Sequence, residues 1–348
     1  MSEIKTLNGY KLVDETARTE AKANAEAIAA IRQKIDRQNP LLTEKQMAAA
    51  KRFAGAFSNV TGIAESFLFF ADPHFSGSQN VSDRFGPWLN QIAAVYNQTP
   101  TSMCVCAGDW LNNSNTRENA CWQLGLIDGA LKSRFDKYIS ILGNHDTNYQ
   151  GYEYIQSGIE DKNYDRNECS KCQLSNEAIR ALWYRRQGNA YFAVDGDCTR
   201  FYVFDSGLDW YDDMTEYRWK QVQWFAQSLL TEKPERAAIL MHIATAPFAN
   251  AVLQIASAYN ARMAIVVHGS PYDFSGAEGV VGFALGGHEH YDYSFVRHGI
   301  PVILTANLSG RDDQPRFDLV LVDWGGKKIH LIRVGDGEDR TIELAEKQ

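Results

Sequence analysis

The sequence predicts an α/β fold for most of the chain. Short, continuous apolar runs recur from residue 66 onward, each bounded by turn-forming residues. Segments with helical spacing separate several of these runs, and two further segments have the pattern of β-hairpins. Continuous apolar runs of this length are typical of strands that are buried on both faces, as in sheets covered by helices.

Two helices are predicted at the N-terminal end. Residues 14–37 are rich in alanine, lack glycine and proline, and are followed by Asn39-Pro40 as a stop signal. The second helix spans 44–57 and is preceded by the capping-box pair Thr43 and Gln46.

The first helix also carries a heptad-like seam, whose members are Ala17, Ala21, Asn24, Ile28, Ile31 and Ile35. Isoleucine at both core positions favours trimers, so the arm predicts a homo-oligomer, most simply a trimer held through residues 14–37. The alternative is a helix that folds back on its own domain, because fewer than three full heptads are present.

The strands and hairpins follow in order along the chain. Apolar runs at 66–72, 102–109, 138–146 and 237–244 predict four buried strands. Residues 190–207 predict a hairpin with its turn near Asp195–Asp197, and residues 317–334 predict another with Gly325-Gly326 at the turn. Between them, residues 216–230 predict a helix with an aromatic face.

Composition limits the possible partners and compartments. The formal net charge of −8 disfavours a nucleic-acid footprint. No apolar run is long enough for a membrane helix, and the first residues do not resemble a secretory signal. We therefore expect a cytoplasmic protein with reduced cysteines. Cys104 and Cys106 are expected in the core, and Cys169-x-x-Cys172 is interpreted as two thiols of a polar insertion rather than half of a zinc site.

The apolar runs share one further property, which is that each ends with or contains side chains able to bind metal. These side chains are Asp72, His74, Asp109, Asn144, His145, Asp146 and His242, and a glycine-rich turn adds His288 and His290. Functional groups in α/β sheets gather beyond the carboxyl ends of the strands, so these residues are predicted to converge. A mixed set of Asp, Asn and His suits Zn, Mn or Fe, and two ions about 3.5–4 Å apart suit phosphoryl transfer.

The ordered motifs D-x-H, G-D, G-N-H-D, a lone His and G-H-x-H resemble the calcineurin-like metallophosphoesterases. The resemblance extends over roughly residues 64–335. It implies a β-sandwich of two mixed sheets flanked by helices in a domain spanning 64–348. That domain would follow an N-terminal arm at 1–40 and a helix with linker at 41–63.

The same resemblance implies a role for each residue. The ligands of the first metal would be Asp72, His74 and His290, and those of the second would be Asn144, His242 and His288. Asp109 would bridge the two ions. His145 would meet the phosphate and protonate the leaving group, and Asp146 would orient the His145 ring.

The expected activity is hydrolysis of phosphate mono- or diesters by a metal-bound hydroxide with a histidine general acid. The alternative is a non-catalytic structural or binding module of a phage-like particle, which would be virion-associated. Residues 7–18, "LNGYKLVDETAR", are similar to leading segments of some phage tail and baseplate proteins.

Some residues depart from the family pattern or have open roles. Glu289 stands between the last two histidines, where threonine is frequent in the family, and bulky Trp110 and Leu111 follow Asp109. His268, His298 and His330 match no motif and are expected to be structural or peripheral. The aromatic residues near the motifs either form a wall for a nucleobase or sugar or pack the sheets; they are Phe75, Trp110, Tyr149, Tyr152, Tyr291 and Tyr293.

Overall fold

The computed structural model describes residues 42–75, 85–112, 117–148, 190–207, 214–309 and 314–347. The predicted N-terminal arm, with its helix at 14–37, lies outside the described residues, as do Cys169, Cys172, Tyr149 and Tyr152. The coiled coil, the trimer and the division into domains therefore stay predictions.

The first sheet contains six strands in the order β14-β13-β12-β1-β2-β3. Three of its strands are parallel to one another: β1 (Ala64–Phe70), β2 (Met103–Cys106) and β3 (Tyr138–Ser140). The other three run antiparallel to their neighbours: β12 (Phe317–Asp323), β13 (Lys328–Val334) and β14 (Arg340–Glu343). The sheet is therefore mixed, and the carboxyl ends of its three parallel strands share one edge.

The second sheet also contains six strands, in the order β10-β11-β9-β6-β5-β4. Its central strands are parallel: β5 (Arg200–Val203), β6 (Arg236–Leu240), β9 (Val280–Gly286) and β11 (Ile300–Leu304). The antiparallel edge strands are β4 (Phe192–Asp195) and β10 (Tyr293–Arg297). A small separate sheet pairs β7 (Ala264–Val267) with β8 (Ser270–Asp273).

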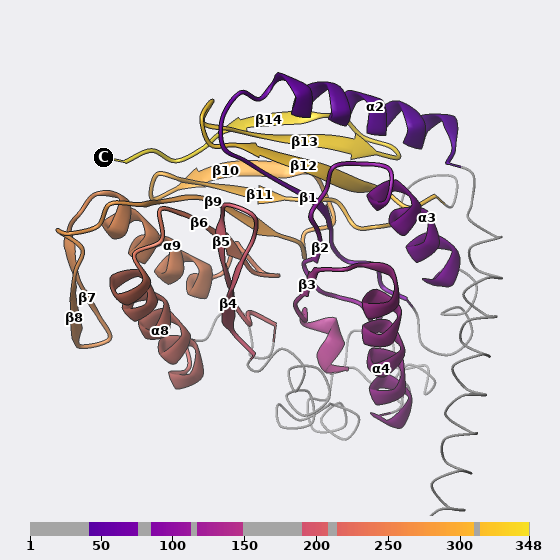
Figure 1. The fold of residues 1–348 in the computed structure, drawn as a ribbon. Helices are drawn as coiled ribbons and strands as arrows, with labels where there is room; N and C mark the ends of the chain where they lie inside the picture. Colours follow the sequence, from indigo (N-terminus) through magenta and orange to yellow (C-terminus); the bar gives the residue numbers. More distant parts are fainter. Residues whose placement is uncertain are drawn as a thin grey trace, which may run out of the picture. The chain divides into compact units, whose positions relative to one another are not determined.

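Helices cover the outer faces of the two sheets, as Figure 1 shows. On the first sheet lie α2 (Glu44–Asn59), α3 (Gly86–Tyr96) and α4 (Arg117–Arg134). On the second lie α8 (Glu216–Glu232) and α9 (Pro247–Asn260). The predicted sandwich of two mixed sheets flanked by helices is confirmed.

The position of strand β1 between two cores explains why its sequence is apolar without interruption. Phe67 and Phe69 belong to the core between the two sheets, whereas Leu68 and Phe70 pack under the helices. Successive side chains of a strand point to opposite faces, so burial on both faces requires apolar residues at every position. Cys104 and Cys106 lie in β2 on the helix-covered face, buried and free, as predicted.

The local predictions for the described segments are confirmed as well. The Thr43 side chain accepts a hydrogen bond from Gln46 N, and the Gln46 side chain accepts one from Thr43 N, so the capping box is complete. The hairpin β4–β5 has its turn at residues 196–199, and the hairpin β12–β13 turns at 324–327. Among the described residues, no helix combines the length and apolarity needed to cross a membrane.

Candidate metal centre

The candidate ligands lie just beyond the ends of parallel strands from both sheets. Asp72 and Asp109 follow β1 and β2, and Asn144 follows β3 at the start of the 3-10 turn η2 (His145–Thr147). The second sheet contributes His242 after β6, and His288 and His290 after β9. Hydrogen bonds from backbone to side chain join the edges of the two sheets. His288 N donates to both carboxylate oxygens of Asp72, at 3.1 and 2.9 Å.

The backbone bends sharply at most of these positions. Five of the candidate ligands have left-handed backbone conformations, with φ of 52° at Asp72, 44° at His74, 56° at Asp109, 72° at His288 and 61° at His290. Such conformations are uncommon for residues other than glycine and cost on the order of 1–3 kcal/mol each. The surrounding hydrogen bonds therefore hold these side chains in fixed directions before any ligand binds.

One group of ligand atoms gathers around Asp72. The group contains Asp72, His74, Asp109 and His290, with one ligand atom from each lying within 4.8 Å of the others. His290 Nε2 is 3.4 Å from Asp72 Oδ1 and 2.9 Å from His74 Nε2. Four converging N and O atoms at this spacing can surround a transition-metal ion.

A second group contains Asp109, His242 and His288, again with ligand atoms within 4.8 Å of one another. His242 Nδ1 lies 2.6 Å from the carbonyl oxygen of Ala107, to which only a protonated nitrogen can donate. This contact leaves His242 Nε2 facing inward, 3.1 Å from Asn144 Oδ1 and 3.2 Å from Asp109 Oδ2. Fixing a histidine tautomer through its second nitrogen is the usual way a protein prepares a metal ligand.

Asp109 is the one residue common to both groups. Its Oδ1 accepts a hydrogen bond from His145 N at 2.9 Å. Its Oδ2 is buried and has no hydrogen bond of good geometry within the part of the chain that the structure describes. This oxygen lies 3.2 Å from His242 Nε2 and 3.7 Å from His74 Nε2, so its neighbours are the candidate ligands themselves. A buried carboxylate oxygen without a well-formed hydrogen bond is costly. A cation on each side of this carboxylate would satisfy it, so the residues present fit a pair of metal ions.

The two predicted catalytic residues lie at the same edge. The His145 ring makes an edge contact with the His74 ring, with 4.7 Å between centroids, and is half-buried. Asp146 is fully buried and accepts hydrogen bonds from Gly143 N and Leu111 N, each at 2.8 Å. These contacts link the loop after β2 to the loop after β3 through Asp146. The role of Asp146 in orienting the His145 ring stays a prediction.

The electrostatics of the site follow from burial and from the two aspartates. Burial lowers the pKa of His74 to about 4, despite the nearby carboxylates. Burial also opposes the charge on His242, but Asp109 and Asp72 raise the pKa of His242 to about 9. Burial raises the pKa of Asp109, but the neighbouring histidines outweigh it and hold that pKa well below its usual range. Burial, assisted by the charge of Asp109, raises the pKa of Asp146 to about 8.

Glycines allow the loops to approach one another. Gly108 has φ of +95°, and a Cβ there would lie 2.6 Å from Gly143 N. A Cβ on Gly143 would lie 2.6 Å from Asp109 N and 2.7 Å from Asp109 Cγ. A Cβ on Gly287 would lie 2.6 Å from Asp72 Oδ2. The glycines of the G-D, G-N-H-D and G-H-x-H motifs therefore leave space for the ligands themselves.

Sequence reasoning did not predict the contacts of three supporting residues. Ser206 Oγ accepts a hydrogen bond from Ile243 N at 2.9 Å, next to His242. Glu289 accepts one from Thr245 Oγ1 at 3.0 Å, which joins the two histidine loops. Asp292 forms ion pairs with Arg333 and Arg340. A signal existed for Ser206, because "FYVFDSG" is another apolar run that ends in polar residues. Nothing in the local sequence indicated the distant partners of Asp292.

The residues with open roles divide clearly. Phe75 and Trp110 are buried in the core of the first sheet, so they pack the fold, whereas Tyr291 and Tyr293 are exposed. The three histidines without a motif all contact residues outside the candidate centre, which agrees with a structural or peripheral role: His268 stacks on Trp219, His298 lies 2.9 Å from Asn250 Oδ1, and His330 lies 3.0 Å from Thr341 Oγ1.

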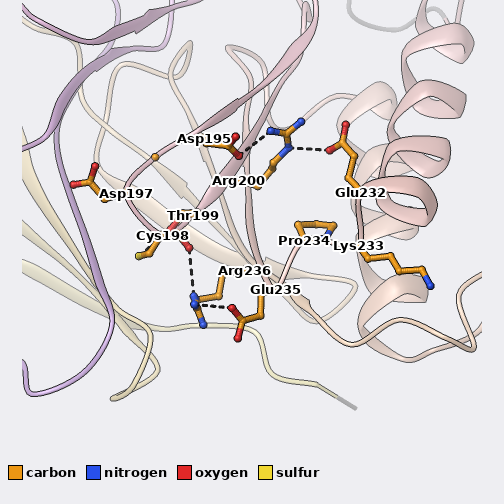
Figure 2. Close-up of a pocket in the computed structure, with 11 residues that line it drawn as sticks. Asp195, Asp197, Cys198, Thr199, Arg200, Glu232, Lys233, Pro234, Glu235 and Arg236 are labelled. Carbon is orange, nitrogen blue, oxygen red and sulfur yellow. Dashed lines mark hydrogen bonds and ion pairs between the residues drawn. The ribbon is translucent and has the colours of Figure 1, made fainter.

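A pocket of about 560 Å³ lies at the opposite, amino ends of β5 and β6 (Figure 2). Its two arginines are paired within the protein. Arg200 bonds Asp195 and Glu232, and Arg236 bonds Glu235 and the carbonyl oxygen of Cys198. The two arginine charges are neutralised, and the metal-ligand candidates lie at the other ends of the strands, so this pocket is separate from the candidate metal centre.

The sandwich of two mixed sheets flanked by helices agrees with the metallophosphoesterase fold, and the two groups of candidate metal ligands lie at one edge of it. Residues 66–292 match the family model described as calcineurin-like phosphoesterase, and the chain belongs to this family. None of the curated protein sequences matches the chain.

Solved structures with a similar fold include two phosphatases. A dimetal phosphatase from Danio rerio has 14% sequence identity and a TM-score of 0.51, covering 80% of this chain and 98% of its own. A purple acid phosphatase from yellow lupin (Lupinus luteus) seeds has 12% identity and a TM-score of 0.48, covering 81% of this chain and 54% of its own.

Proposed function

We propose that the protein hydrolyses phosphate esters with two metal ions bridged by Asp109. The observation that carries this proposal is the sharing of Asp109 by both ligand groups, together with its buried Oδ2 atom, which lies 3.2 Å from His242 Nε2 and 3.7 Å from His74 Nε2. Asp72, His74 and His290 would complete one coordination shell, and the second would be completed by Asn144, His242 and His288. This set of oxygen and imidazole ligands suits Mn, Zn or Fe.

Two bound ions would supply positive charge to the phosphoryl oxygens and lower the pKa of a water molecule that attacks phosphorus. The protein's own contribution is to hold the ligand side chains in place. The left-handed backbone conformations beyond the strand ends and the Asp72–His288 hydrogen bonds fix these side chains, so they need not move when the substrate binds. The half-buried His145 ring lies next to the ring of the ligand candidate His74. We assign His145 the transfer of a proton to the leaving oxygen.

The experiment that tests this proposal compares wild type with Asp109→Asn. Hydrolysis of p-nitrophenyl phosphate and its bis-ester is measured with Mn, Zn or Fe added, and bound metal is counted by elemental analysis. Loss of metal from both positions is expected, because one charge serves both ions. Full metal content in the variant would refute the bridging role. A metal-loaded wild type without activity on any phosphate ester would instead favour the non-catalytic alternative.

A matched control comes from another buried aspartate. Asp318 is fully buried and pairs with Arg333 and Arg340, and it does not belong to either ligand group. Asp318→Asn tests whether loss of a buried charge alone is enough to expel metal. Metal loss in Asp109→Asn with retention in a folded Asp318→Asn protein would assign the effect to coordination.

A further inference from the structure

A row of ring side chains begins immediately after the ligand candidate His290. Tyr291 is the next residue, and Tyr293, Phe295 and Arg297 follow at intervals of two along the edge strand β10. Residues two apart in a strand lie on the same face, so Tyr293, Phe295 and Arg297 form one row. Tyr291 precedes the strand, and its ring contacts that of Tyr293, the first member of the row. With Tyr291, the row therefore starts one residue after a candidate metal ligand and continues along the edge of the second sheet.

The side chains of this row contact one another in sequence. The centroids of the Tyr291 and Tyr293 rings are 6.0 Å apart, and those of Tyr293 and Phe295 are 5.6 Å apart and stacked. The Arg297 guanidinium lies 5.2 Å from the centroid of the Phe295 ring. Phe295 also packs against the core beneath the helices. Tyr291 and Tyr293 are 51% and 48% exposed, so their rings present apolar surface to solvent.

The exposed pair is anchored by the residue that separates its members. Asp292 lies between the two tyrosines, and its side chain pairs with Arg333 and accepts a hydrogen bond from Ala306 N at 3.1 Å. Arg333 is almost fully buried and also pairs with Asp318 at 3.0 Å. A charge anchored in the core fixes the backbone on both sides of it, so the tyrosines are held in place rather than folded inward.

We propose that Tyr291 and Tyr293 form a stacking subsite for a planar aromatic group, such as a nucleobase, of a substrate whose phosphate lies at the metal centre. This inference rests on the proposed function. In a nucleotide, a sugar separates the phosphate from the base, and a ring pair that begins next to a ligand of the phosphate site matches that arrangement. The free energy of stacking a base on aromatic side chains is large enough to set a substrate preference, and stacking does not require a basic surface.

The test uses two substrates with similar primary leaving groups that differ in the base. Adenosine 5′-monophosphate carries a nucleobase, and ribose 5-phosphate does not. We expect wild type to favour the nucleotide in kcat/KM, mainly through KM. The variant Tyr291→Ala/Tyr293→Ala should lower the ratio of the two kcat/KM values by about 10-fold, the scale of stacking on one or two rings. Tyr291→Phe/Tyr293→Phe should keep the ratio.

The control is Trp122→Ala, which removes a 60% exposed aromatic side chain from α4, on the other sheet. It should leave the ratio unchanged. A ratio that is the same in wild type and the double-alanine variant would overturn the proposal. If the metal-loaded wild type hydrolyses neither substrate, the proposed function fails separately. Calorimetric binding of the two compounds then decides the subsite: selective loss of nucleotide binding in the double-alanine variant supports it, and equal binding refutes it.

Discussion

Adding one methyl group at Gly143 should disable the site without changing any candidate ligand. In Gly143→Ala the new Cβ would lie 2.7 Å from Asp109 Cγ and 2.6 Å from Asp109 N, with the carboxylate Oδ1 closer still. Carbon atoms pack at about 3.5–4.0 Å, so the Asp109 carboxylate would have to retreat by roughly 1 Å. Because Asp109 belongs to both ligand groups, the displacement affects both at once.

A misplacement of about 1 Å at a catalytic centre can reduce the rate about 10²-fold. We expect kcat/KM for p-nitrophenyl phosphate to fall by about that factor in Gly143→Ala, with weaker binding of both ions. The measurements are steady-state kinetics across a metal titration, elemental analysis, and thermal unfolding to show that the variant is folded.

Gly125→Ala provides the matched control for this prediction. Gly125 lies in α4, and its Cβ would meet nothing within 4 Å. The same chemical change there should preserve activity and raise stability by about 0.4–1 kcal/mol, because alanine has less freedom in the unfolded chain. A folded Gly143→Ala protein with wild-type metal content and wild-type kcat/KM would refute the steric reasoning.

Four further predictions concern chemistry, metal, pH and assembly. The His145→Ala variant should retain its metal, but its hydrolysis rate should fall about 10²–10⁴-fold for substrates with poor leaving groups, and by less for substrates that release p-nitrophenolate. An equal fall in rate for both kinds of substrate would indicate that His145 only binds phosphate. Removal of metal by a chelator should lower the temperature midpoint of unfolding, because the ligand candidates come from both sheets and bound metal would link them. An unchanged midpoint after metal is removed from a metal-loaded protein would contradict this linkage. Burial lowers the pKa of His330, so the unfolded state takes up protons first as the pH falls below about 6.5 and stability decreases; His330→Gln should flatten that decrease in denaturant titrations, and parallel pH profiles would contradict the assignment. Light scattering should find an oligomer for the intact chain and not for a chain starting near Leu41; a monomeric intact chain would exclude the arm as an oligomerisation element.

Much of the fold was predictable because both faces of its central strands are buried. The run containing Phe67, Leu68, Phe69 and Phe70 is apolar throughout, since alternate residues face the second sheet and the helices. Capping and turn signals predicted α2 and two hairpins for equally local reasons. The edge strand β10, whose residues are largely exposed, lacks such a continuous apolar pattern, and it was not predicted individually.

The convergence of the candidate site was predictable for a different reason. Parallel strands end at one edge, so side chains that follow them must meet there, and Asp72, Asp109 and His242 do so. The supporting contacts were not predictable, because they join residues far apart in the chain. Asp292 meets Arg333, and Thr245 meets Glu289, through pairings that only the assembled sheets create.

The pairing of β1 with β12 determines when the candidate centre can exist during synthesis of the chain. The first ligand candidates follow the C-terminal end of β1. The antiparallel partner of β1 is β12 (Phe317–Asp323), which comes later in the sequence than every ligand candidate. Contacts this distant in sequence form late and close long loops. A nascent or truncated chain that ends before β12 would contain all the ligand side chains but lack half of the first sheet. The candidate metal centre should therefore form only after β12 has been synthesised.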